Sequence, residues 1–199
     1  YALGENTFFF DEGEYIAIAE SISNGTGFAL DGNLTASRAP LYPFLISFLN
    51  NTGLGIFGMR LMNISLLIFT LVLLQKILSS YFHLNKYYSL LIILLSPVFV
   101  YLSVLLLPQT LGSFLLMLFL YLLSTTYSNS KYIFMGATFG FLCLTIPNFL
   151  ILGLLFPFLF KFICQSEEIQ IRNIFFYFLF MSIPILFWVA RNYIVFELF

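Results

Sequence analysis

The chain has 199 residues, of which 61% are hydrophobic and 9% are charged, and its formal net charge is −1. A soluble domain carries about 25% charged residues. With a mean hydropathy of +1.00, this chain cannot cover itself with polar groups, so we expect an integral membrane protein. The balanced charge forms no basic stripe and excludes nucleic acid as the expected partner.

The first 58 residues are predicted to form an extracytoplasmic loop. This segment holds six of the nine acidic residues: Glu5, Asp11, Glu12, Glu14, Glu20 and Asp31. Asp11, with Glu14 three residues later, predicts the N-cap of a helix. The apolar face of this helix is formed by Tyr15, Ile18, Ala19 and Ile22. A helix with one such face is expected to lie on the bilayer and to stop at the glycines of 24–27.

A small hairpin is predicted next. Asp31-Gly32 lies between Phe28–Leu30 and Asn33–Thr35, and this pattern favours a primed turn. Pro40 and Pro43 then fix the backbone where the chain re-enters the apolar zone. Pro43–Leu49 is too short to span a bilayer, so we expect a re-entrant or interfacial helix.

Residues 59–199 are predicted to form an all-α, multi-pass transmembrane helix bundle of about six spans, to which the loop adds a juxtamembrane helix. A bilayer core of ~30 Å needs about 20 helical residues. The expected spans are Met59–Leu78, Tyr88–Leu107 with a kink at Pro97, Pro108 to about Tyr127, two short helices in Ile133–Cys164 that turn at Pro147-Asn148, and Asn173–Ala190 with a kink near Pro184. The chain begins at Tyr1 and ends at Phe199 beside an apolar run, so we expect a fragment of a longer protein.

The basic residues predict the orientation. Five fall on one side of this threading, namely Lys76, Lys86, Lys131, Lys161 and Arg172, and three fall on the other, namely Arg38, Arg60 and Arg191. The larger group is expected in the cytoplasm. The acidic loop then lies on the extracytoplasmic side of the cell membrane, which is the inner or plasma membrane.

Each candidate site residue has two interpretations. Asp11 and Glu12 either cap a helix or supply a general base. Arg38 is either a solvated or headgroup-contacting side chain or a forked donor to a phosphate. Gln109 either binds a ligand or helps to cap a helix, and Arg191 either contacts a phosphate or anchors the end of a span.

The order of several motifs resembles that of the GT-C glycosyltransferases. The motifs are Phe10-Asp11-Glu12, Gly25 and Gly27, Arg38-Ala39-Pro40-Leu41-Tyr42-Pro43, Gly58-Met59-Arg60-Leu61, Leu144-Thr145-Ile146-Pro147 and Trp188-Val189-Ala190-Arg191-Asn192-Tyr193. The branch that these motifs resemble is the bacterial relatives of dolichyl-phosphate-mannose–protein mannosyltransferases and of aminoarabinose transferases.

This resemblance implies an inverting enzyme that takes a sugar from a polyprenyl-phosphate donor to an extracytoplasmic lipid, glycan or protein acceptor. Asp11 matches the catalytic carboxylate and Glu12 is its neighbour. Arg38 matches the basic position near the lipid phosphate, and Tyr42, Gln109 and Arg191 are assigned with it to substrate binding.

Cofactor use and two other functions stay open. Some relatives bind a divalent cation at acidic residues of this loop, and the Asp11-Glu12 pair does not decide whether this chain does. Many relatives carry Glu where Gln109 stands and Arg where Ile146 stands. The alternatives are a transporter or flippase component for a lipid-linked sugar and a non-catalytic membrane subunit.

Overall fold

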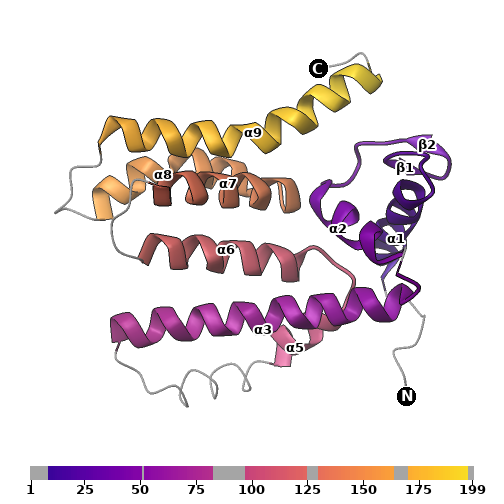
Figure 1. Cartoon of the computed structure of the whole chain (residues 1–199), viewed down its shortest axis with the longest axis horizontal. Helices are drawn as coiled ribbons and strands as arrows, with labels where there is room; N and C mark the ends of the chain where they lie inside the picture. The colour runs from indigo at the N-terminus through magenta and orange to yellow at the C-terminus, as the bar shows by residue number, and fades with distance from the viewer. Residues whose placement is uncertain (1–8, 51, 83–96, 125–129, 164–169, 197–199) are drawn as a thin grey trace. The chain divides into compact units, whose positions relative to one another are not determined.

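The structure is a computed structural model that describes residues 9–50, 52–82, 97–124, 130–163 and 170–196. Most of these residues are helical (Figure 1). In chain order the elements are α1 (Phe10–Ser23), β1 (Ala29–Leu30), β2 (Asn33–Leu34), α2 (Leu41–Asn50), α3 (Gly55–Phe82), α5 (Pro97–Val104), α6 (Gln109–Ser124), α7 (Ser130–Thr145), α8 (Phe149–Ile163) and α9 (Ile171–Phe196). They form two compact units, Tyr1–Phe114 and Leu115–Phe199. These units are defined by packing. The predicted boundary at residue 58 instead separates an extracytoplasmic loop from a transmembrane bundle, and the two units do not test it.

In the first unit, helix α1 packs against α2 and β1. Tyr15, Ile18 and Ala19 are buried along one face of α1. The Tyr15 ring meets the ring of Tyr42 edge-on, with 5.5 Å between the centroids. The predicted apolar face is therefore confirmed for these three residues. The expectation that this face lies on the bilayer is wrong, because α2 and the hairpin cover it.

Helix α1 begins earlier than the sequence predicts. Its N-cap is Phe9, and Glu12 is the third helical residue. The backbone N–H of Phe9 donates to Glu12 Oε2 over 3.2 Å, which is the carboxylate half of a capping box. The prediction of an Asp11 cap with Glu14 as its partner is wrong, because Glu12 does this work and the other two side chains bind Arg38.

The predicted hairpin is confirmed. β1 and β2 pair antiparallel, with Ala29 opposite Leu34 and Leu30 opposite Asn33. Asp31 and Gly32 connect them with φ angles of 51° and 78°. Two consecutive positive φ values are the signature of a type I′ turn, which the right-handed twist of the strands favours.

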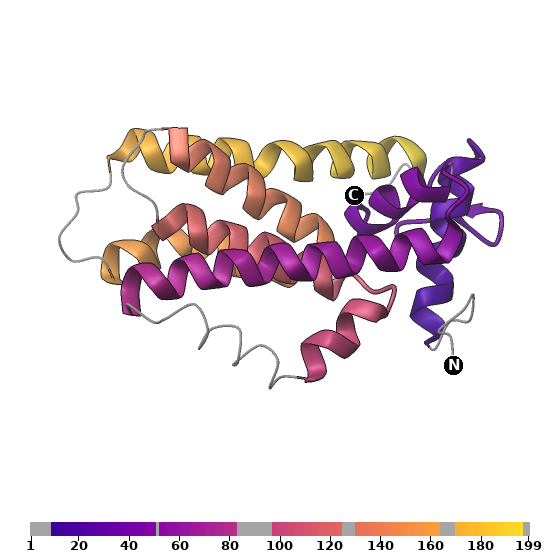
Figure 2. The same ribbon diagram turned by 60° about the horizontal axis from the view of Figure 1, so that its bottom comes forward.

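Helices α3 and α5 extend the first unit, and α5 packs against α3, to which it runs obliquely in Figure 2. Helix α3 is longer than the predicted Met59–Leu78. Of the predicted span Tyr88–Leu107, residues 88–96 lie outside the described residues. The described helix α5 ends at Val104, three residues short of the predicted Leu107, because the backbone groups of the next two residues bind the side chains of Asn63 and Glu12.

In the second unit, α7 packs closely on α9, as Figure 1 shows. A Cβ atom at Gly140 would lie 2.5 Å from the carbonyl oxygen of Met181, and one at Gly136 would overlap the carbonyl of Tyr177. Small residues four apart let two helix backbones approach this closely. Because the higher-numbered glycine meets the higher-numbered carbonyl, the two helices run parallel. This contact is the glycine seam, and its Gly-x-x-x-Gly spacing is a signal that the sequence analysis missed.

The predicted pair of short helices around Pro147-Asn148 is confirmed as α7 and α8. An aromatic cluster joins these helices to α9 and includes Phe119 of α6. The Phe119 ring lies 4.7 Å from that of Phe156 and 4.9 Å from that of Phe139. Tyr177 closes the cluster and donates its hydroxyl to the carbonyl of Gly153 over 3.2 Å, so the one polar atom of this side chain is satisfied.

Two described helices are long and apolar enough to cross a membrane. They cover Gly55–Ser80 and Ile171–Phe196, with mean hydropathies of 2.0 and 1.9. The second contains the predicted Pro184, and it changes direction near its middle in Figure 1. Helices α6 and α8 are apolar but shorter, and residues 125–129 and 164–169 beyond them lie outside the described residues. The bundle of about six spans stays a prediction.

Candidate functional site

Arg38 lies between two carboxylates of α1. Its Nη2 is 2.5 Å from Asp11 Oδ1, and its Nε is 2.6 Å from Glu14 Oε2. Asp11 and Glu14 are three residues apart, so they share one face of the helix. The guanidinium carbon also lies 5.5 Å from the centroid of the Tyr15 ring. The hydrogen bond to Glu14 is the main reason why the pKa of Arg38 is raised, so this side chain stays charged. We call these four side chains the arginine cluster.

The arginine cluster leaves polar atoms at its surface. Asp11 is 51% exposed and uses one carboxylate oxygen for Arg38, which is 26% exposed. The Nη1 atom of Arg38 binds neither carboxylate, and the Tyr15 hydroxyl also interacts with the guanidinium through a side-chain hydrogen bond. A guanidinium that keeps one nitrogen off both carboxylates is still able to receive an anion. The pairing itself, between partly exposed groups, stabilises the fold by at most about 1 kcal/mol per pair.

Glu12 occupies a different environment from its neighbour Asp11. Its side chain has no exposed surface. The backbone N–H of Leu106 donates to Glu12 Oε1 over 2.7 Å, and that of Phe9 donates to Oε2 over 3.2 Å. Glu12 therefore ties the start of α1 to the connection between α5 and α6. The predicted catalytic role of Glu12 requires an exposed carboxylate oxygen, and Glu12 has none in this structure.

Tyr42 is also fully buried. Asn63 Nδ2 donates to Tyr42 Oη over 3.0 Å and to the carbonyl of Leu105 over 2.6 Å. Burial raises the pKa of the Tyr42 hydroxyl far above its ordinary value, so it stays protonated. This network joins α2, α3 and the α5–α6 connection, and it places the predicted substrate contact of Tyr42 inside the protein.

Gln109 and Arg191 do not belong to the arginine cluster. Gln109 begins α6 and lines a cavity of about 20 Å³, which has room for about one water molecule. Arg191 belongs to the second unit. Its Nη1 donates to Asn192 Oδ1 over 2.9 Å, and its guanidinium carbon lies 5.0 Å from the ring centroid of Trp188. Within the first unit, the structure thus brings Asp11 and Arg38 into direct contact.

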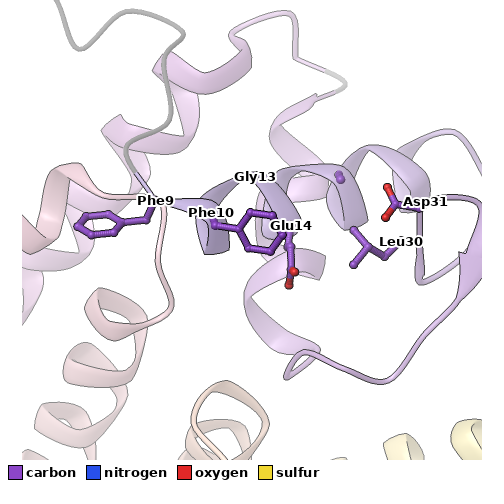
Figure 3. A pocket seen from close by; sticks show the side chains of 7 residues that line it. Phe9, Phe10, Gly13, Glu14, Leu30 and Asp31 are labelled. Atoms are coloured by element: carbon purple, nitrogen blue, oxygen red, sulfur yellow. The ribbon is translucent and has the colours of Figure 1, made fainter.

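A hollow of about 530 Å³ borders the cluster at Glu14. It is lined by Phe9, Phe10, Gly13, Glu14, Ala17, Leu30 and Asp31. Figure 3 shows the side chains of Phe10 and Glu14 on α1 and those of Leu30 and Asp31 on the hairpin. From the sequence, Glu14 is expected to support a helix cap and has no predicted ligand role. Its spacing from Asp11, in a loop with one basic residue, is the signal that pointed to a shared partner.

Within the described ranges, no group of three or more His, Cys, Asp or Glu side chains is arranged to hold a metal ion. The described residues of the loop therefore offer no ligand set for the divalent cation that was considered from the sequence. Comparisons with models of known protein families, with curated proteins and with solved structures find no match to this chain.

Proposed function

We propose that this chain is part of a multi-pass membrane glycosyltransferase that moves a sugar from a polyprenyl-phosphate donor to an extracytoplasmic acceptor. The observation that carries the proposal is the direct pairing of Asp11 with Arg38 at 2.5 Å. A base for the acceptor and a cation for the leaving phosphate are the two groups that this reaction needs, and they lie side by side. The two helices able to span a membrane agree with a lipid-linked donor.

In the proposed reaction, an acceptor hydroxyl attacks the anomeric carbon while its proton passes to Asp11. The bond from that carbon to the phosphate oxygen breaks, and the phosphate leaves with the electron pair. Arg38 stabilises the charge that develops on the phosphate. Attack opposite the leaving group inverts the anomeric configuration.

The pairing in the arginine cluster adds an order to these events. A phosphate that binds Nη1 and Nη2 of Arg38 with two parallel hydrogen bonds displaces Asp11 from Nη2. Glu14 keeps its bond to Nε and holds the guanidinium in place. Donor binding therefore releases the carboxylate that acts as base, while Glu12 and Tyr42 keep α1 and α2 in position.

The test compares Asp11→Asn with Glu20→Gln in the full-length protein. Both changes remove one carboxylate from an exposed position of α1. We expect sugar transfer from a polyprenyl-phosphate sugar to fall by about 10²–10⁴-fold in the first variant, the usual contribution of a general base, and to persist in the second. Equal transfer by both would remove Asp11 as the base. Native mass spectrometry should show a polyprenyl-phosphate on the wild type and its loss in Arg38→Ala.

One observation favours a non-catalytic membrane subunit. Arg38 is already paired with two carboxylates, and such a cluster is a sufficient structural link between α1 and the segment before α2. This candidate predicts that Asp11→Asn lowers thermal stability and leaves transfer by the assembled complex unchanged. It also predicts that the chain purified without partners transfers no sugar.

A further inference from the structure

The hollow beside α1 has a negatively charged lining. Glu14 and Asp31 contribute carboxylates from α1 and from the hairpin turn, and no basic side chain occurs among its described lining residues. Arg38 borders the hollow through its bond to Glu14 and is also held by Asp11. An anion would meet repulsion here, because like charges at this range oppose binding.

Several atoms of this lining are open to a ligand. Glu14 binds Arg38 through Oε2, while its Oε1 accepts no hydrogen bond from the described residues. The Asp31 carboxylate likewise accepts none within the described part of the chain, since Asn33 bonds only its backbone carbonyl. Phe10 is 83% exposed. A Cβ atom added at Gly13 would meet nothing within 4 Å, so the space of the hollow next to the Gly13 backbone is unfilled.

We propose that this hollow binds an organic cation, a substituted ammonium group that lies over the Phe10 ring between the carboxylates of Glu14 and Asp31. The negative face of an aromatic ring attracts ammonium groups, and each carboxylate adds Coulomb attraction. A volume of about 530 Å³ lies within the range of small-molecule sites. The proposal adds a second ligand to the region and does not depend on sugar transfer, because a donor phosphate is expected at Arg38.

The test uses choline as the probe with the full chain in nonionic detergent. Its control ligand is the uncharged alcohol in which carbon replaces the choline nitrogen, because the two have nearly the same shape. We expect saturation-transfer NMR to give a dissociation constant on the order of millimolar for choline. The alcohol should bind at least about 10-fold more weakly, because it lacks both electrostatic terms. Equal binding of the two probes would overturn the proposal.

Four variants locate the site. Asp31→Asn keeps a residue that the type I′ turn favours and should weaken choline binding about 2–5-fold. Phe10→Leu keeps an apolar side chain without the ring and should weaken it by a similar factor. Gly13→Leu should fill the hollow and abolish binding, whereas Gly13→Ala, its matched control, should retain it. Unchanged binding in Gly13→Leu would place choline elsewhere and refute the assignment.

Arg38→Gln separates this proposal from the proposed function. The change frees Oε2 of Glu14 and removes the nearby positive charge, so choline binding should strengthen about 2–5-fold. The same change should abolish binding of the donor phosphate. Weaker choline binding in this variant would contradict the cation site, and it would leave the glycosyltransferase proposal untouched.

The cation has two possible sources, a free amine or a zwitterionic lipid headgroup. Nanodiscs of phosphatidylcholine and of phosphatidylglycerol distinguish them. Loss of the choline signal in the first lipid alone supports the site with a headgroup as its ligand. A signal that persists in both supports the site with a free amine. Absence of choline binding in detergent and in both lipids would overturn the proposal.

Discussion

The change Glu12→Gln tests whether this buried carboxylate is the link between α1 and the α5–α6 connection. Its two oxygens accept backbone N–H bonds from Leu106 at 2.7 Å and from Phe9 at 3.2 Å. A glutamine has one acceptor oxygen, so its NH₂ group must face one of these donors. A hydrogen bond to a charged group contributes about 1.5–3 kcal/mol, and an unsatisfied buried donor costs about 1–3 kcal/mol.

We therefore expect the free energy of local opening at Leu106 to fall by about 2–3 kcal/mol in Glu12→Gln. Since each 1.4 kcal/mol is a factor of ten, amide exchange there should be about 30- to 150-fold faster. Hydrogen–deuterium exchange of the full chain in detergent, followed on peptides that cover residues 105–112, measures this rate. Glu20→Gln is the control, because Glu20 is exposed on the same helix. Exchange at Leu106 that is the same in both variants would refute the reasoning.

Three further predictions concern stability and are checked by thermal melts in detergent. Gly140→Ala should destabilise the second unit by about 1–3 kcal/mol through overpacking, whereas Gly13→Ala, a helical glycine with open space around it, should stabilise α1 by about 0.5–1 kcal/mol. A raised Tm for both would argue against the glycine seam. Asn63→Ala should destabilise the protein by about 2–4 kcal/mol, because it leaves the buried Tyr42 hydroxyl and the buried carbonyl of Leu105 without their donor. An unchanged Tm would exclude that network. Arg38→Gln should lower stability by about 1 kcal/mol, and by less at high salt, because its ion pairs are partly exposed. A loss several times larger would mean that the arginine cluster is a structural core.

Local signals in the sequence were enough to predict several elements. Asp31-Gly32 between two short β-prone runs predicts the hairpin that the structure contains. Pro147-Asn148 predicts the turn between α7 and α8, because proline cannot continue the first of them. The apolar spacing of Tyr15, Ile18 and Ala19 predicts the buried face of α1. What covers that face could not be predicted, since a bilayer and a neighbouring helix demand the same residue types.

The candidate site was predictable in two of its members and not in its contacts. Asp11 and Arg38 were recognised, but nothing in their spacing of 27 residues indicates a direct ion pair. Glu12 looks like Asp11 in the sequence. The feature that separates the two is a backbone N–H of Leu106, a group that every residue except proline carries and that no sequence pattern reveals. The early end of α5 was missed for the same reason. In the sequence, Leu105 and Leu106 look like a continuation of the apolar span, and the partners of their backbone groups cannot be seen there.

The bond between Glu12 and Leu106 also has a consequence for synthesis of the chain. The two residues are 94 positions apart, and elongation proceeds at about 5–20 residues per second. The ribosome thus needs about 5–19 s after making Glu12 to make its partner. During that interval the Leu106 donor is absent, and water can take its place at the Glu12 carboxylate. We expect the acidic segment to mature late, only after the α5–α6 connection has been made, although it is translated near the start of this chain. Completion of its assembly therefore requires the arrival of a distant backbone amide in addition to its own local signals.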